Sequence, residues 1–271
     1  MNARSLSAST LSASTLAGRI ALVTGGAGGL GTALCRALAA RGATVIACDV
    51  DEEGLQRVVG ESIAQIAQQG GGSENSGARS RGSIHALRMN LADAEDIQRG
   101  VQTVVREYGG MDILIHAAVR HFAGDDGREG RAFDQHSPQQ VMETLAVNVT
   151  GPTLLTQLLC QGMIERRWGR IVLVGSMHRS GTPGLVMYAA SKAFLNTLAR
   201  GLFLELREHN IVASVANPGG MNTALHGFGY SWMLDPAIVA ETIVGFLELP
   251  QGVAALSFEM VPHDPEHPDA F

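Results

Sequence analysis

The segment from Ile20 to Val50 constrains the fold more than any other part of the chain. It begins with IALVTGG, a short apolar run that ends in glycines, and continues with LGTALCRALAARG, where apolar residues recur at helical spacing. A second apolar run, TVIACDV, follows. A run, a helix and a run within about 30 residues are typical of a βαβ unit. The continuous apolar runs predict parallel strands buried on both faces of a sheet.

The same alternation continues to the C-terminus. Further helices are expected at 52–69, 93–107, 138–166, 188–209 and 236–249, and further strands at 84–90, 112–118, 169–176, 211–219 and 255–261. This order predicts an α/β fold, a Rossmann-like, doubly wound parallel sheet of about seven strands flanked by six helices.

Two segments interrupt the alternation. Residues 70–82 are rich in Gly and Ser, and a mobile surface loop is expected there. Residues 120–138 form a long connection at the carboxyl end of the fourth predicted strand. Ligands of doubly wound sheets bind at that edge, so this connection either borders a pocket or is an exposed insertion.

Bulk properties exclude several classes of protein. The formal net charge is −6 and no basic stripe occurs, which argues against a nucleic acid or membrane partner. The apolar runs are of strand length, so no transmembrane helix is expected. The three cysteines form no metal-binding or disulfide pattern. Residues 1–17 contain LSAST twice and no secretory signal, which indicates a disordered tail and a cytoplasmic location.

A glycine-rich turn, TGGAGGLG at Thr24–Gly31, joins the first predicted strand to the first predicted helix. Glycines at such a turn let the backbone approach a pyrophosphate, and the helix N-terminus attracts its negative charge. A turn needed only for packing is the weaker alternative. We therefore expect residues 18–271 to form a single dinucleotide-binding catalytic domain, with phosphate contacts from Gly25, Gly28, Gly29, Leu30 and Gly31.

An acidic residue, Asp49, ends the second predicted strand 18 positions after Gly31. A carboxylate there accepts both hydroxyls of an adenosine ribose and repels a 2′-phosphate. No Arg or Lys occurs within Gly25–Gly31 to bind such a phosphate. The charge favours NAD as the cofactor over NADP. Asp49 could instead cap the next helix, although Asp51 is better placed for that.

The segment GSMHRSGTPGLVMYAASK combines three residues suited to proton chemistry. Tyr188 follows Ser176 by 12 positions, and Lys192 lies one helical turn beyond, on the same helix face. A free tyrosine titrates near pH 10, and lowering its pKa by about 3 units requires roughly 4 kcal/mol. A partly desolvated ammonium supplies much of this, and Ser176 can orient a substrate oxygen. A chance pairing of a buried Tyr and Lys is the weaker alternative.

These motifs resemble the short-chain dehydrogenase/reductase family, in its shorter, single-domain branch, from about Gly18 to Pro250. The resemblance rests on TGxxxGxG in the turn, VNVTG around residue 148, the serine after IVLVG, YAASK at 188–192 and NPGGMNT at 217–223. It implies reversible hydride transfer between NAD(H) and a secondary alcohol or ketone, with a tyrosine as general acid/base and no metal. The catalytic residues so implied are Asn148, Ser176, Tyr188 and Lys192.

The resemblance also implies cofactor contacts beyond the glycine turn. Lys192 should bond the nicotinamide ribose, and Asn148 should hold a water that links Lys192 to solvent. Thr223 should contact the nicotinamide amide, unless it only caps a short helix. The remaining cofactor contacts implied are Asn90, Leu91, His116, Tyr188 and Pro218.

The chain departs from the family at three places. Residues 116–119 read His-Ala-Ala-Val where Asn-Asn-Ala-Gly is usual, which removes hydrogen bonds between the central strands. Val119 also adopts positive φ at greater cost than Gly. His116 is either a proton relay or, preferably, a hydrogen-bonded buried imidazole. Asn90 replaces an acid on the adenine side, and the C-terminus lacks the usual Asp-Gly-Gly, so the tetramer contact built there is in doubt.

Two sets of residues point to different classes of substrate. An aromatic rim within 220–235 suggests a ring or an acyl chain, through His226, Phe228, Tyr230, Trp232 and Met233. A positive rim would suit an acidic or hydroxylated substrate, but each of its members is more commonly a solvated loop residue: Arg120, His121, His178 and Arg179.

Two rival functions are a sugar-nucleotide-modifying enzyme of the same superfamily and a catalytically weak cofactor-binding regulator. The short segment after Thr223 disfavours the first, and the intact tetrad disfavours the second. Assembly as a homodimer or homotetramer is expected, because the family pairs subunits through the two long helices and residues 194–206 have apolar surface to spare.

Overall fold

The computed structural model describes residues 16–69, 82–123, 130–223 and 232–263. The expected tail at 1–17 lies outside them except for its last two residues, and so does the loop at 70–82 except for Gly82. Of the expected aromatic rim, only Trp232 and Met233 are described. Leu16 is buried in the core, so ordered packing begins two residues before the predicted domain start at Gly18.

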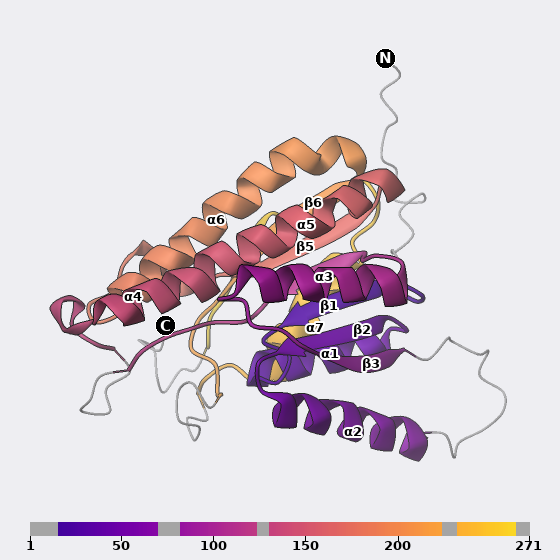
Figure 1. Cartoon of the computed structure of the whole chain (residues 1–271), viewed down its shortest axis with the longest axis horizontal. Helices are drawn as coiled ribbons and strands as arrows, with labels where there is room; N and C mark the ends of the chain where they lie inside the picture. The colour runs from indigo at the N-terminus through magenta and orange to yellow at the C-terminus, as the bar shows by residue number, and fades with distance from the viewer. Residues whose placement is uncertain (1–15, 70–81, 124–129, 224–231, 264–271) are drawn as a thin grey trace.

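The described strands form one seven-stranded parallel sheet, in the order β3-β2-β1-β4-β5-β6-β7 (Figure 1). The doubly wound α/β prediction is confirmed. The strands are parallel, but the direction in which the chain adds successive strands to the sheet reverses between β1 and β4. Ligands of such sheets bind at this point. The strands are β1 (Ile20–Thr24), β2 (Thr44–Asp49), β3 (Ser83–Arg88), β4 (Ile113–His116), β5 (Gly169–Val174), β6 (Ile211–Pro218) and β7 (Ser257–Met260).

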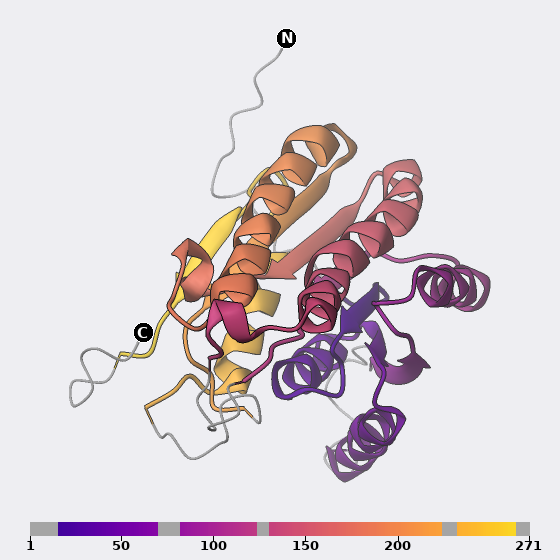
Figure 2. The same cartoon turned by 60° about the vertical axis from the view of Figure 1, so that its left-hand side comes forward.

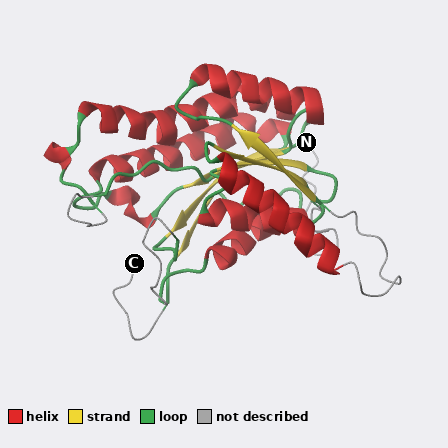
Figure 3. Ribbon diagram, turned by 60° about the horizontal axis from the view of Figure 1, so that its bottom comes forward, coloured by secondary structure: helices red, strands yellow, loops and turns green. Residues whose placement is uncertain are grey.

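Helices cover both faces of the sheet, which lies between them in Figures 2 and 3. Their bounds agree with the predictions to within a few residues, except between 138 and 166. The helices are α1 (Gly29–Ala40), α2 (Glu52–Gln69), α3 (Ala94–Tyr108), α4 (Pro138–Leu145), α5 (Gly151–Arg166), α6 (Val186–Leu206) and α7 (Pro236–Leu247), and short 3-10 turns occur at η2 (Phe133–Gln135), η4 (Met177–Ser180) and η5 (Arg207–His209).

The single helix predicted at 138–166 is interrupted by a π-helical turn, η3 (Ala146–Thr150), between α4 and α5. Apolar spacing did not reveal the interruption, because the π turn has five residues and helical periodicity is read over about 11–18. Such turns often occur at functional sites, and this one contains Asn148.

Alternate strand residues build two separate cores. Ala21 and Val23 of β1 pack with α1, α2 and α7, whereas Leu22 between them packs with α3 and α5 on the opposite face. This follows from the two-residue period of a strand. Helix α6 covers the far half of the second face, where Leu195 packs on the β5–β6 region. Both faces of the central strands are buried, so only the strand ends are available to a ligand.

Candidate active site

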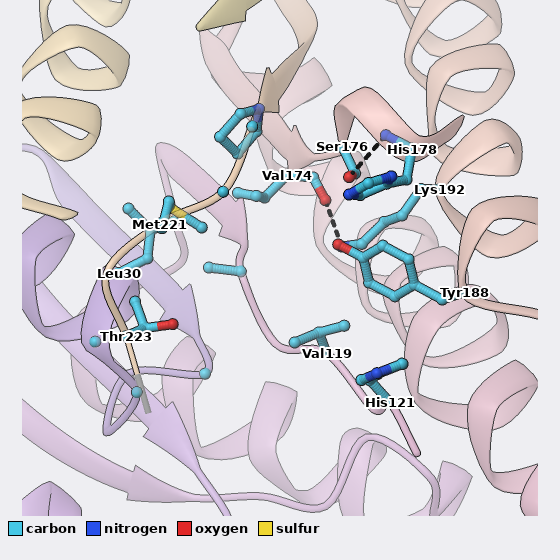
Figure 4. A pocket seen from close by; sticks show the side chains of 18 of the residues that line it. Leu30, Val119, His121, Val174, Ser176, His178, Tyr188, Lys192, Met221 and Thr223 are labelled. Carbon is cyan, nitrogen blue, oxygen red and sulfur yellow. Dashed lines mark hydrogen bonds between the residues drawn. The ribbon is translucent and has the colours of Figure 1, made fainter. Parts of the chain in front are cut away.

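A cavity opens at the carboxyl edge of the sheet, where the ends of β1, β4, β5 and β6 meet (Figure 4). It runs from the glycine turn before α1 to the first turns of α6. Its described lining comprises Gly25, Gly28, Gly29, Leu30, Gly31, Ala117, Val119, His121, Val174, Gly175, Ser176, His178, Leu185, Tyr188, Lys192, Pro218, Gly219, Gly220, Met221 and Thr223.

The glycine turn leaves no space for a side chain at Gly25 or Gly31. Gly25 has a φ of 69°, and a Cβ there would lie 2.8 Å from the backbone of Ala118. A Cβ on Gly31 would lie 1.9 Å from the carbonyl oxygen of Gly25. Helix α1 begins at Gly29 with neither a side-chain cap nor an acidic residue in its first turn. The turn therefore offers an uncapped helix N-terminus with room for an anion, as a pyrophosphate requires.

Asp49 lies beside this turn but does not line the cavity itself. Its Oδ2 accepts a hydrogen bond from Ala27 N at 3.1 Å, and its Oδ1 accepts one from Val50 N at 2.7 Å. Helix α2 is capped instead by Asp51, whose Oδ1 accepts from Gly54 N at 2.9 Å. Asp51 thus caps α2, whereas the carboxylate of Asp49 is held against the phosphate turn.

The predicted adenine-side residues lie away from the main cavity. Asn90 N donates to Asp96 at 2.8 Å, and its side-chain oxygen accepts from Ala92 N at 3.0 Å. Leu91 is buried in the core. Both follow β3 at the carboxyl edge of the sheet, and the chain there reaches the start of α5, where a Cβ on Gly151 would lie 2.5 Å from Leu91 O.

His116 points away from the cavity into the protein. It is buried at the end of β4, and its Nε2 lies 2.9 Å from Thr156 Oγ1 on α5. Desolvation lowers the pKa of His116 to about 3, so the imidazole is neutral near pH 7. A buried, hydrogen-bonded imidazole fits this geometry and a proton relay to the cavity does not, since only its neighbours Ala117 and Val119 line that space.

Tyr188 and Lys192 both line the cavity from α6 (Figure 4). Lys192 Nζ lies 5.5 Å from the ring centroid of Tyr188 and donates to Val174 O at 2.7 Å. Burial lowers the pKa of Lys192 to about 8. The ammonium is thus charged at neutral pH but poorly solvated, which strengthens its field at the phenol.

Ser176 is held by a network that sequence reasoning missed. Its backbone N–H donates to Asn217 Oδ1 at 3.1 Å, and its Oγ accepts from His178 N at 3.1 Å. Asn217 and Asn196 exchange two amide hydrogen bonds, at 3.0 and 3.1 Å. These bonds join the ends of β5 and β6 to α6. The signals of the network in the sequence were Asn196, one turn after Lys192, and Asn217 at the start of NPGGMNT.

Asn148 is buried in the π turn and does not line the cavity. Its side chain clamps the backbone of Arg120, accepting from N at 2.7 Å and donating to O at 2.9 Å. It also donates to Ser191 Oγ at 3.1 Å. Asn148 therefore anchors the segment after β4 to α6, close to the segment that carries Tyr188.

Pro218 and Thr223 both line the cavity, and Figure 4 shows Thr223 on the side opposite Tyr188. Thr223 is buried, and its Cγ2 would lie 3.0 Å from a Cβ on Gly29. The segment after β6 thus packs directly on the glycine turn. Both predicted residues therefore belong to the cavity lining, and Thr223 lies next to the glycine turn.

Two histidines expected to be solvated loop residues lie in the cavity instead. His121 stacks edge-on against Tyr188, with ring centroids 5.5 Å apart, and His178 lies beside Ser176. The connection at 120–138 therefore borders the pocket at its start. Arg120 is exposed and pairs with Glu143, as expected of a solvated loop residue. Arg179 differs from that expectation: it is half-buried, pairs with Glu259 and donates to the carbonyl oxygen of Ser176 at 3.3 Å.

Two further features bear on the class of protein. Within the described ranges no helix is long and apolar enough to cross a membrane. Nor do the described His, Cys, Asp and Glu residues form a group of three that could hold a metal ion.

Comparison with known proteins identifies the family of the chain. The family model for short chain dehydrogenase matches residues 19–232. A 3-oxoacyl-[acyl-carrier-protein] reductase of Aquifex aeolicus is 32% identical over 209 residues, which cover 77% of this chain and 76% of the relative. A 2,3-dihydro-2,3-dihydroxybenzoate dehydrogenase of Bacillus subtilis is 30% identical over 240 residues, covering 88% and 82%.

A solved structure shares the fold. A metagenomic short-chain oxidoreductase in complex with NADP superposes with a TM-score of 0.76 at 24% identity, covering 93% of this chain and 100% of the other. The family match spans most of the chain and includes the glycine turn, the serine and the Tyr–Lys pair. This protein therefore belongs to the short-chain dehydrogenase family of oxidoreductases.

Proposed function

We propose that this protein transfers a hydride between NAD(H) and a secondary alcohol or ketone, with Tyr188 as the general acid/base. The observation that carries the proposal is the convergence of Ser176, Tyr188 and Lys192 on a cavity that begins at an uncapped glycine turn. Of the two relatives, one is named a reductase and the other a dehydrogenase, so names for both directions occur among them.

The residues of the cavity fit a nicotinamide dinucleotide. Its pyrophosphate would rest on Gly28–Gly31, and its nicotinamide would lie between Tyr188 and the segment with Pro218 and Thr223. The cofactor supplies the hydride donor or acceptor, so no metal is required. Lys192 would reach the nicotinamide ribose, and Asn148 would keep the water that relays protons to Lys192.

NAD is proposed as the preferred form because of Asp49. Its carboxylate is held beside the turn by Ala27 N, where it would accept the ribose hydroxyls and repel a 2′-phosphate. No basic residue lies within the turn to offset that repulsion. Asn90, Leu91 and the backbone at His116 complete the proposed cofactor contacts on the adenine side and beneath the cavity.

The chain's own residues would manage the proton. In oxidation, the phenolate of Tyr188 takes the hydroxyl proton while the Ser176 hydroxyl donates to the same oxygen. In reduction, the phenol returns the proton to the developing alkoxide, which is met by two O–H donors. The ammonium of Lys192 keeps the phenolate accessible near neutral pH.

We also propose a homodimer or homotetramer, formed through α5 and α6. Three large apolar side chains on these helices are exposed by about 38–51%, a cost that burial in a partner interface would remove: Leu158, Phe194 and Leu204. Residues 18–271 would form the single catalytic domain, in a cytoplasmic protein.

The test is to mix the protein with NAD and a panel of secondary alcohols, and with NADH and the matching ketones. We expect NADH absorbance to appear or vanish with at least one pair, and to be lost in Tyr188→Phe. Tyr108→Phe, the same exchange on α3 and outside the cavity lining, is the matched control. Tight NADH binding without turnover of any substrate would instead support the cofactor-binding regulator.

A further inference from the structure

His178 lies in the cavity in an arrangement that the proposed hydride chemistry does not require. It belongs to the 3-10 turn η4, directly after β5. Its backbone N–H donates to Ser176 Oγ at 3.1 Å, and its ring Nδ1 lies 2.9 Å from Thr182 Oγ1. Figure 4 shows the ring pointing into the cavity beside Ser176 and the hydroxyl end of Tyr188.

The contact with Thr182 orients the ring of His178, with Nδ1 towards the Thr182 hydroxyl and Nε2 on the other side of the ring. Among the described residues the Thr182 hydroxyl makes no other hydrogen bond, so its proton is free to go to Nδ1 of His178. In the neutral tautomer whose Nδ1 accepts from Thr182, the ring proton resides on Nε2, which is then an N–H donor. Nε2 has no hydrogen-bond partner among the described protein atoms. An orientated donor is thus left for a ligand or a water.

The surroundings of this donor favour an oxygen acceptor, including a negative one. The ionisable side chains lining the cavity within the described ranges are His121, His178, Tyr188 and Lys192. A smaller pocket adjoins it at Tyr188 and His121, and is lined further by Arg120 and His136. No described Asp or Glu lines either space, although Glu143 pairs with Arg120 at 3.3 Å.

Ser176 and Tyr188 are the two donors aimed at the reacting oxygen, and His178 adds a third donor that the reacting oxygen does not need. We propose that His178 Nε2–H binds a second oxygen of the substrate, on the carbon next to the reacting one. The preferred substrates are then alcohols and ketones with a neighbouring hydroxyl or carboxylate group. This inference rests on the proposed function of the same site.

Three ketones with one carbon skeleton test it: butan-2-one, 1-hydroxybutan-2-one and 2-oxobutanoate. The kcat/KM of NADH-dependent reduction is measured for each. We expect wild type to prefer the two oxygenated ketones, and His178→Phe to lower that preference about tenfold or more, because it keeps a ring but removes the donor. His178→Gln, which retains an N–H donor, should restore part of the ratio.

Two other variants control the test. Ser180→Ala, an exposed position in the same turn, should leave the ratio unchanged. Thr182→Val should also lower the preference for the oxygenated ketones, but by less than His178→Phe does. The substitution removes the hydrogen bond that holds the ring of His178 and leaves the ring in place. All variants keep the backbone N–H that bonds Ser176.

The outcomes separate this inference from the proposed function. Turnover with the same ratio in wild type and His178→Phe, or an equal loss on all three ketones, would overturn the role of His178 and leave the hydride chemistry standing. Absence of turnover in wild type, on these ketones and on the wider panel, would overturn both.

Discussion

Replacing Lys192 by Met removes the buried ammonium while keeping the length of the side chain. Lys192 Nζ lies 5.5 Å from the ring centroid of Tyr188. Coulomb's law at that distance, with an effective dielectric constant of about 20, gives about 3 kcal/mol in favour of the phenolate. That corresponds to about 2 pKa units. We therefore expect the pKa of Tyr188 to rise by about 2 units in Lys192→Met.

A titration followed by the ultraviolet absorbance of the phenolate measures the pKa of Tyr188 without any substrate. The chain has three tyrosines, so the titration of each protein minus that of the same protein with Tyr188→Phe isolates Tyr188. Burial lowers the pKa of Lys192 to about 8, so its ammonium is present below that pH. The two Tyr188 titrations are therefore compared in the part of the curve below about pH 8. Bound NAD should lower the pKa of Tyr188 further in both proteins.

The rate of alcohol oxidation should follow the same shift. The phenolate is the base, so the rate rises with pH through the pKa of Tyr188, and its half-maximum should move upward in Lys192→Met. A Tyr188 titration that coincides in the two proteins would refute the electrostatic reasoning. A lower rate with an unshifted pH profile would indicate that Lys192 acts only by holding the cofactor.

Other perturbations test the cofactor site, the core and the assembly. Asp49→Ala should raise the ratio of kcat/KM for NADP over NAD by about tenfold or more, because it removes an acceptor and a repelling charge. Gly31→Ala should abolish NADH binding in a fluorescence titration, since its Cβ would meet a carbonyl oxygen at 1.9 Å, whereas Gly60→Ala, with nothing within 4 Å, should slightly raise the melting temperature. His116 has a folded pKa of about 3, below its ordinary value near 6.5, so the unfolded chain binds the proton first and stability falls as pH drops through that window. From about pH 7.5 to pH 5, the unfolding free energy in urea should fall by about 2 kcal/mol more in wild type than in His116→Asn. Phe194→Glu should shift the molar mass in light scattering toward the monomer, and an unchanged mass would place the interface elsewhere.

The spacing of residues along the sequence predicted those parts of the candidate site that lie on a single helix or turn. Tyr188 and Lys192 are one helical turn apart, so their shared face followed from the sequence alone. The glycines of the turn were equally informative, because the close approach of Gly31 to Gly25 involves residues six positions apart. The order of strands and helices predicted the sheet, since alternating elements of this kind have few other ways to bury both faces.

Contacts between distant elements depended on the tertiary structure. The support of Ser176 by Asn217 and Asn196 requires β5, β6 and α6 to meet, and no local pattern encodes that meeting. The same holds for His121 against Tyr188, which are 67 positions apart in the sequence. Sequence periodicity reports which face of an element is buried, but not which partner a polar side chain finds there. Residue types at local spacing therefore predicted the family, and the packing of the strand ends decided which residues line the cavity.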